Sequence, residues 1–268
     1  MFVLLRPALL SLLLAIMPVA GHAAEPLTCT LIADVESGAV LVRDGTCDQR
    51  VAPFSTFKLP LAVMGFETGI LKDSHTPSWH WQPGIAAPER DRKSVDPTIW
   101  ERDSVLWYSR ELVQRMGAEE FGALVARMDY GNRDVVGTAG KDNGMTHAWL
   151  GASLTISPEE QVQFVRRLVL GQLPVSAGAQ AGARATLPSF PAGDGWVLTG
   201  KTGSGWVTDA RGNYAKDRSL GWFIGWAERG DDRVAFARLL VDNQARGGAL
   251  GLTMRDSLIT DWPALVQR

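Results

Sequence analysis

Cysteine and histidine are scarce in this chain of 268 residues, which has only two cysteines and four histidines. Three of the histidines, His75, His80 and His147, follow the N-terminal segment, and they show no zinc-ligand spacing with each other or with the cysteines. The sequence therefore predicts no metal site.

An excess of positive charge is also lacking, because 27 lysines and arginines stand against 29 aspartates and glutamates, a formal net charge of −2. Nucleic-acid-binding domains usually carry a basic patch and an isoelectric point above about 9, so we expect no nucleic-acid partner. The sequence has no repeats, and 46% of its residues are hydrophobic, which excludes a disordered or collagen-like chain. Single cores stop growing at roughly 250–300 residues, so this length allows one large domain or two small ones, and we expect one unit of two lobes.

Long hydrophobic stretches are limited to the N-terminus, where the apolar run over residues 7–20 is shorter than the ~20 residues that span a bilayer. The run follows Arg6 and precedes the small residues near Ala23 and Ala24, a pattern typical of a secretory signal peptide. We predict that residues 1–24 are removed; the alternative is an uncleaved membrane anchor. Without Arg6, 26 basic residues remain against 29 acidic ones, so we expect no membrane partner after cleavage.

Export would make the two cysteines a potential pair, because an oxidising compartment allows a disulfide to form. Residues 30–34 and 39–42 are predicted to form two strands around a turn, and such a hairpin would bring Cys29 and Cys47 together. We predict a Cys29–Cys47 disulfide; the alternative is two buried free thiols.

The remaining pattern alternates between helical and strand periods. Helices are predicted over 55–66, 104–116, 119–128, 157–170 and 250–267, strands over 196–199, 220–226 and 234–241, and irregular structure over 72–100. The start of the 157–170 helix is marked by a capping box in which Pro158 follows Ser157 and precedes Glu160. These elements predict an α/β fold of the α+β type, with one domain over residues 25–268. We expect an antiparallel sheet that is built from both termini and flanked by helices, with a helical lobe inserted at roughly 72–185.

The first chemical candidate is the pair Ser55 and Lys58, whose spacing of three places both on one helix face. A serine hydroxyl needs a base to remove its proton during attack, and lysine is a base only when uncharged. Its pKa must then fall from about 10.4 to about 7, which corresponds to about 4 kcal/mol. Alternatively, the neutral amine reacts with carbon dioxide to give an anionic carbamate that accepts the proton. Both routes require a dry site, which the apolar neighbours of Lys58 favour.

Ser-x-x-Lys is a short motif, and taken alone it is equally consistent with a surface lysine after a helix-start serine. Two further segments follow it in order: Tyr130-Gly131-Asn132 after a helical stretch, and Lys201-Thr202-Gly203 at the end of a predicted strand. In isolation each is also explained by turn chemistry. Their combination is what indicates a catalytic site.

These segments resemble one enzyme family. The matching pieces are Ser55-Thr56-Phe57-Lys58, the element starting at Ser104, Tyr130-Gly131-Asn132, Trp149-Leu150 and Lys201-Thr202-Gly203. Ser-x-x-Lys followed by Lys-Thr-Gly is the signature of serine β-lactamases and penicillin-binding proteins. From about Ala33 to its C-terminus the sequence is similar to the class D, or oxacillinase-type, serine β-lactamases.

The resemblance implies a set of catalytic roles. Ser55 would attack the β-lactam carbonyl, and carboxylated Lys58 would be the base for both acylation and deacylation. Trp149 would donate its indole N–H to that carbamate; without the resemblance, a core tryptophan is the simpler explanation. Ser104 would relay a proton toward the lactam nitrogen, and Lys201 would supply positive charge beside it.

The resemblance also implies how substrate is held. The backbone N–H groups of Ser55 and Ser204 would form an oxyanion hole, and Arg255 would pair with the drug's carboxylate. Without the resemblance, Arg255 is an ordinary solvated arginine on the terminal helix. The predicted substrate-binding residues are Leu106, Leu150, Thr202, Gly203, Ser204 and Arg255.

One departure concerns the second element, which reads Ser104-Val105-Leu106 where class D enzymes usually carry Ser-x-Val. We expect Leu106 to alter an apolar lid over Lys58 without abolishing catalysis. Class A β-lactamases and penicillin-binding proteins resemble each other in having Asn at this position, so Leu106 argues against both.

The rival functions are a peptidoglycan transpeptidase or carboxypeptidase, and a single-turnover β-lactam sensor.

The implied cellular setting completes the predictions. The exported protein would act in the periplasm as a monomer or homodimer on a small β-lactam substrate. It would need no cofactor other than the carbon dioxide or bicarbonate that supplies the Lys58 carbamate.

Overall fold

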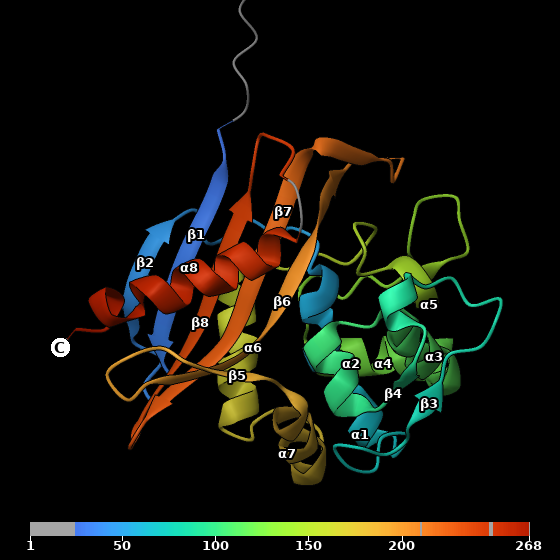
Figure 1. Cartoon of the computed structure of the whole chain (residues 1–268), viewed down its shortest axis with the longest axis horizontal. Helices are drawn as coiled ribbons and strands as arrows, with labels where there is room; N and C mark the ends of the chain where they lie inside the picture. The colour runs from blue at the N-terminus through green and yellow to red at the C-terminus, as the bar shows by residue number, and fades with distance from the viewer. Residues whose placement is uncertain (1–24, 210, 247–248, 268) are drawn as a thin grey trace, which may run out of the picture.

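The central element is a six-stranded antiparallel sheet in the order β2-β1-β8-β7-β6-β5 (Figure 1). The computed structural model describes residues 25–209, 211–246 and 249–267. The strands are β1 (Leu27–Asp34), β2 (Val40–Gly45), β5 (Ser189–Pro191), β6 (Val197–Thr208), β7 (Tyr214–Arg229) and β8 (Asp232–Val241). Since β1 pairs with β8, the two ends of the sequence share one sheet. The predicted α+β class and sheet arrangement are confirmed.

The sheet is buried on both faces, because alternate side chains of its inner strands enter different core clusters. On β7, Trp222 and Ile224 belong to the larger cluster, whereas Phe223 between them belongs to the smaller one. On β8, Phe236 lies in the smaller cluster and its neighbour Ala237 in the larger one. These strands therefore consist of apolar runs and not of apolar and polar residues in alternation.

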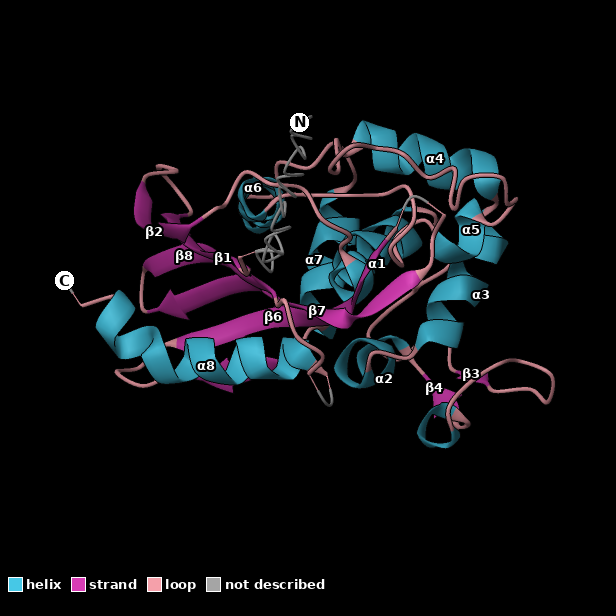
Figure 2. Cartoon of the chain, turned by 90° about the horizontal axis from the view of Figure 1, so that it is seen from above, coloured by secondary structure: helices cyan, strands magenta, loops and turns pink. Residues whose placement is uncertain are grey.

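Two helices cover the two faces of the sheet (Figure 2). The first, α8 (Leu250–Leu265), packs on β6 and β7, and the second, α6 (Pro158–Val169), packs on β8, β7 and β1. The predicted capping box of α6 is confirmed: the Ser157 hydroxyl accepts from the Glu160 N–H, and the Glu160 carboxylate accepts from the Ser157 N–H.

The helical lobe lies beside the β6 end of the sheet (Figures 1 and 2). It contains α1 (Lys58–Glu67), α2 (Pro97–Asp103), α3 (Leu106–Met116), α4 (Ala118–Arg127), α5 (Gly144–His147) and α7 (Ala177–Thr186), with the short strands β3 (Trp79–His80) and β4 (Ser94–Val95) and the 3₁₀ turns η1 (Phe54–Phe57) and η2 (Glu89–Asp91). All of it except η1 and α1 lies between residues 72 and 186.

Several predicted boundaries are wrong. Residues 72–100 are not wholly irregular, because Asp96 caps a helix that begins at Pro97. Ser104 does not start a helix: its φ of 60° is left-handed, so it ends α2, and α3 begins at Leu106. Helix α7 was not predicted, since its sequence contains two glycines, which disfavour helix, and no large apolar residue.

The predicted strand at 196–199 is also too short. Strand β6 runs from Val197 to Thr208, so Lys201-Thr202-Gly203 lies inside a strand and not at its end. Three glycines of β6 allow close packing: a Cβ atom would collide with strand β7 at Gly200 and with the turn η1 at Gly203 and Gly205.

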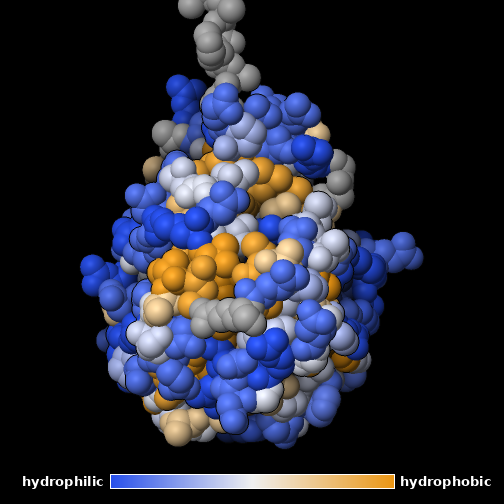
Figure 3. Space-filling model, turned by 90° about the vertical axis from the view of Figure 1, so that its left-hand side faces the viewer, coloured by the Kyte–Doolittle hydropathy of each residue, from blue (hydrophilic) through white to orange (hydrophobic). Residues whose placement is uncertain are grey.

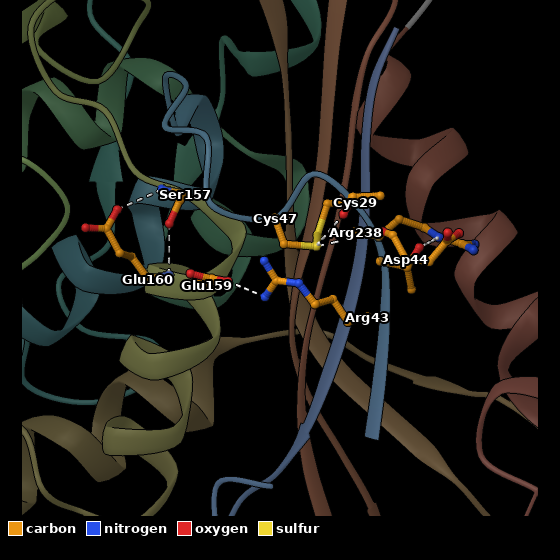
Figure 4. Close-up of a disulfide and its surroundings, with 10 residues drawn as sticks. Cys29, Arg43, Asp44, Cys47, Ser157, Glu159, Glu160 and Arg238 are labelled. Atoms are coloured by element: carbon orange, nitrogen blue, oxygen red, sulfur yellow. Dashed lines mark hydrogen bonds and ion pairs between the residues drawn. A yellow bond between two sulfur atoms is a disulfide. The ribbon is translucent and has the colours of Figure 1, made fainter. Parts of the chain in front are cut away.

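The two cysteines are joined by a disulfide with a Cα–Cα distance of 5.2 Å (Figure 4). Cys29 lies on β1, and Cys47 follows β2, whose Gly45 is paired with Cys29. Nearby, Arg43 of β2 pairs with Glu159 of α6, which ties the edge strand to the helix that covers the sheet.

The face that carries β2 and the end of α8 shows apolar surface among polar side chains (Figure 3). Leu41, Leu265 and Val266 are partly buried and pack against the smaller core cluster. Within residues 25–209, 211–246 and 249–267, no helix has the length and apolar character needed to cross a membrane. The predicted signal segment 1–24 lies outside the described residues.

Candidate active site

Ser55 lies in the 3₁₀ turn η1, immediately before helix α1, so it does not begin an α-helix as the sequence suggested. Phe54 before it has a φ of 49°, a left-handed conformation that is strained for a bulky side chain. Its N–H donates to the carbonyl of Trp149 at 2.9 Å, and the Trp222 indole N–H donates to the Ala52 carbonyl at 3.0 Å. These contacts hold the strained turn in place.

The predicted pair of Ser55 and Lys58 is in contact. The Lys58 amine donates to the Ser55 hydroxyl at 3.3 Å, and Lys58 itself is 1% exposed. Burial lowers the pKa of Lys58 to about 7, and the positive charge of Lys201 lowers it further. A lysine that gives up its proton near neutrality can accept one from a serine, or react with carbon dioxide.

A second lysine and serine face this pair from the other side. Lys201, on β6, donates to the Ser104 hydroxyl at 3.1 Å and to the Thr202 carbonyl at 3.2 Å. The left-handed backbone of Ser104 ends α2 and directs the chain into α3. Burial lowers the pKa of Lys201 to about 8, while the carboxyl group of Glu101 acts in the opposite direction.

Strand β6 lies closer to η1, the turn that carries Ser55, than side chains on the strand would allow. A Cβ atom added at Gly203 would lie 2.8 Å from the Pro53 carbonyl oxygen and 3.1 Å from the Thr56 nitrogen, and one at Gly205 would lie 2.2 Å from the Phe54 ring. Glycine at these positions therefore lets the β6 backbone lie against η1.

A cavity of about 450 Å³ opens above these residues. It is lined by Ser55, Arg90, Asp91, Lys93, Arg102, Asp103, Ser104, Thr202, Ser204, Ala249 and Leu252. Ser55, which contacts Lys58, and Ser104, which contacts Lys201, thus line the same cavity. A larger cavity of about 540 Å³ lies between β2 and α6, but none of the predicted catalytic or substrate-binding residues lines it.

Trp149 lies beneath the site as part of an aromatic cluster. Its ring stacks on Phe57, with centroids 5.3 Å apart, and Phe57 in turn meets the Tyr130 ring edge-on at 5.5 Å. Asn132 fixes the neighbouring loop, because its amide donates to the Ser153 carbonyl at 2.7 Å and accepts from the Thr155 N–H at 3.0 Å. The Tyr130-Gly131-Asn132 segment supports the site and does not line the cavity.

Four predicted substrate-binding residues do not line the cavity: Gly203, which packs against η1, and Leu106, Leu150 and Arg255. Leu106 and Leu150 are partly buried against the larger core cluster. The Arg255 guanidinium lies 4.9 Å from the centre of the Phe190 ring and pairs with Asp256. On the same helix, Leu252 lines the cavity three residues before Arg255.

One buried acid beside the site was not predicted. Glu101 is fully buried on α2, and burial raises the pKa of its carboxyl to about 7, against the opposing charges of Lys201 and Lys58. No motif marks it; it lies three residues before Ser104, on the helix that Ser104 ends. Within the described ranges, no three His, Cys, Asp or Glu side chains gather where they could hold a metal ion.

Comparison with known proteins extends the likeness to nearly the whole chain. Residues 28–258 match the family described as penicillin binding protein transpeptidase domain. β-Lactamase OXA-9 of Klebsiella pneumoniae is 44% identical over 255 residues, which cover 94% of this chain and 93% of that protein. β-Lactamase OXA-1 of Escherichia coli is 30% identical over 237 residues, which cover 87% and 82%.

A solved structure gives the same result for the fold. The crystal structure of the OXA-427 class D β-lactamase is 37% identical and aligns with a TM-score of 0.82, covering 88% of this chain and 97% of that one. Since the matches span the sheet, the helical lobe and the Ser55–Lys58 and Ser104–Lys201 contacts, the chain belongs to the penicillin-binding protein transpeptidase family and, within it, to the class D β-lactamases.

Proposed function

We propose that the protein hydrolyses the amide bond of penicillin-type β-lactam antibiotics through an acyl-enzyme on Ser55. The observation that carries this proposal is the 3.3 Å contact between the Ser55 hydroxyl and a buried Lys58 whose pKa is lowered to about 7. The relatives named β-lactamase at 44% and 30% identity support the choice of substrate.

In the acylation step, the base at Lys58 removes the Ser55 proton as the serine oxygen attacks the β-lactam carbonyl carbon. The backbone N–H groups of Ser55 and Ser204 hold the developing oxyanion, and both residues line the cavity. The C–N bond then breaks, and Ser104 passes a proton to the leaving nitrogen. Lys201 assists because its amine donates to the Ser104 hydroxyl.

In the deacylation step, a base must remove a proton from the attacking water. We propose that this base is the Lys58 carbamate, formed when the neutral amine bonds to carbon dioxide and releases a proton. Trp149 would donate its indole N–H to the carbamate, and its stacking on Phe57 keeps the ring beside the turn that precedes Lys58. The cavity rim holds the drug's carboxylate through Arg255.

Turnover of a penicillin by the mature chain tests the proposal. The purified protein over residues 25–268 is mixed with benzylpenicillin, and steady-state hydrolysis and intact-protein mass are followed together. Repeated turnover with a transient acyl adduct that Ser55→Ala abolishes is the expected result. A stable adduct with a single turnover would instead indicate a sensor or a transpeptidase and would contradict hydrolysis.

Export to the periplasm through cleavage of residues 1–24 is part of the same proposal, supported by the signal-peptide pattern and by the disulfide between Cys29 and Cys47. Expression of the full-length gene product in a Gram-negative host tests it. A periplasmic fraction that contains protein with an N-terminus near residue 25 is expected; an unprocessed chain in the membrane fraction would contradict it.

A further inference from the structure

Glu101 is a buried acid that the proposed reaction does not use. It lies on α2 with no exposed surface, and neither of its carboxylate oxygens has a hydrogen-bond partner among the described residues. A buried carboxylate without hydrogen bonds loses its hydration and gains no local contact in return. Such a group is expected to persist only where a nearby opposite charge, or a function, balances the cost.

Two positive groups act on Glu101 from different elements. Both lysines lower the pKa of Glu101, against the rise that burial causes. Lys201 of β6 has the larger effect, and Lys58 of α1 has the smaller one. For Lys201, Glu101 is the charge that opposes the lowering of its pKa by burial. For Lys58, the Lys201 cation has a larger effect than Glu101, and it favours loss of the Lys58 proton.

The other charged groups on elements packed against α2 have their own partners or act elsewhere. On α7, Arg184 donates to the Leu168 carbonyl, and beside β4 Lys93 pairs with Asp103. Arg110 of α3 and Asp91 of η2 act on Lys58, in opposite directions. Thus the charges that bear on Glu101 are those of the two site lysines.

We propose that Glu101 is a positioning residue of the active site: its buried carboxylate holds the proton on the Lys201 amine, and the Lys201 cation in turn leaves the Lys58 amine without one. The two lysines are chemically alike and both buried, yet the reaction needs one charged and one neutral. Glu101 supplies the asymmetry, because the Lys201 amine donates to Ser104, the residue that ends the helix carrying Glu101, whereas the Lys58 amine donates to Ser55 of η1. The larger effect of Lys201 on Glu101 agrees with this placement. This inference rests on the proposed function, since it assigns opposite protonation states to Lys201 and Lys58.

The pH profile of kcat/KM for benzylpenicillin tests the role, with Glu101→Gln as the main variant. Removing a negative charge lowers the pKa of nearby lysines, so the alkaline limb, where Lys201 loses its proton, should move to lower pH by about one pH unit. The acid limb should move in the same direction, because Glu101 also acts on Lys58. A residue with only a structural role would lower the whole profile without moving its limbs.

Two further variants make the test decisive. Glu101→Met removes the charge with an apolar side chain of similar length, which a buried position tolerates, and it should move the limbs as Glu101→Gln does. Glu111→Gln removes a negative charge from an ion pair with Arg115 on α3 and should leave the profile unchanged. Unmoved limbs in an active, folded Glu101 variant would overturn the role of Glu101 alone. A wild-type protein without penicillin turnover would overturn the proposed function and this inference together.

Discussion

Gly203 of β6 lies so close to Pro53 that a Cβ atom on Gly203 would be 2.8 Å from the Pro53 carbonyl oxygen. This contact sets the distance between the strand that carries Lys201 and the turn that carries Ser55. Two of the three obstructing atoms are backbone atoms, the Pro53 oxygen and the Thr56 nitrogen at 3.1 Å, and the third is the methyl carbon of the fully buried Thr56, so none of them is the end of a flexible side chain.

We therefore expect Gly203→Ala to reduce kcat/KM for benzylpenicillin by at least about tenfold, since small displacements of reacting groups cost on the order of 10²-fold in rate. Thermal unfolding should show that the variant still folds. The matched control is Gly178→Ala on α7, where an added Cβ meets nothing within 4 Å. It should keep full activity and gain up to about 1 kcal/mol of stability. Equal activity of the two variants would show that the close approach of β6 is not needed.

Burial of Lys58 makes a prediction about stability and pH. In the folded protein the pKa of Lys58 is lowered to about 7, whereas an unfolded lysine has a pKa of about 10.4. Between these values the unfolded chain binds more protons, so this lysine's contribution makes stability rise with pH across the window. Below pH 7 the full cost of burying the amine is present.

Lys58→Met should then be inactive but more stable than the wild type at pH 7, by about 1–3 kcal/mol, and the difference should shrink as the pH approaches 10. Urea unfolding at several pH values measures it. Lys72→Met, at an exposed lysine, serves as the control and should show no such trend. A Lys58→Met protein less stable than the wild type at pH 7 would mean that the buried amine is a net source of stability.

The sequence predicted best those features whose cause is local. The α6 start depends on Ser157 and Glu160, which satisfy each other's backbone groups, and it was found at the correct residue. Similarly, the apolar runs predicted as strands over 220–226 and 234–241 lie within β7 and β8, which pair with each other.

Features that depend on tertiary contacts could not be predicted from local patterns. The left-handed backbone of Ser104 and the extension of β6 through Gly203 and Gly205 are set by neighbours distant in sequence. Glu101 gave no signal, because an acidic residue on a short helix is ordinarily exposed. Its role emerges only when Lys58 and Lys201 are brought beside it.

Arg255 is predicted to bind the drug's carboxylate, although its guanidinium here lies over Phe190 and pairs with Asp256. Arg255→Ala should raise KM for benzylpenicillin at least about tenfold, because a charge-assisted hydrogen bond contributes about 1.5–3 kcal/mol, and it should lower kcat much less. A carboxylate held equally in ground and transition states contributes uniform binding, whose loss appears in KM.

The control for Arg255 is Asp256→Asn, which removes the competing carboxylate and should not raise KM. If KM for Arg255→Ala barely changes, the carboxylate is bound elsewhere. Lys201 and Thr202 would then be the next candidates, since Thr202 lines the cavity and Lys201 lies next to it in the chain.

The assignment of the base is tested at Trp149, whose ring stacks on Phe57. Trp149→Phe keeps an aromatic ring on Phe57 but removes the indole N–H. If that N–H stabilises a Lys58 carbamate with about 1.5–3 kcal/mol, its loss should lower turnover roughly 10- to 100-fold. Acyl-enzyme should accumulate in intact-protein mass spectra, and added bicarbonate should restore part of the rate by mass action.

Lys58→Ala separates the carbamate from other causes. It should accumulate acyl-enzyme as well, but bicarbonate cannot restore it because the amine is missing. For the wild type, activity should fall in acid, where the carbamate is protonated and lost, and recover with bicarbonate. If the wild type is indifferent to bicarbonate depletion at low pH while Trp149→Phe deacylates normally, the base is the unmodified amine or another group. If the base is the unmodified amine, the lowered pKa of Lys58 explains how it accepts a proton near neutral pH.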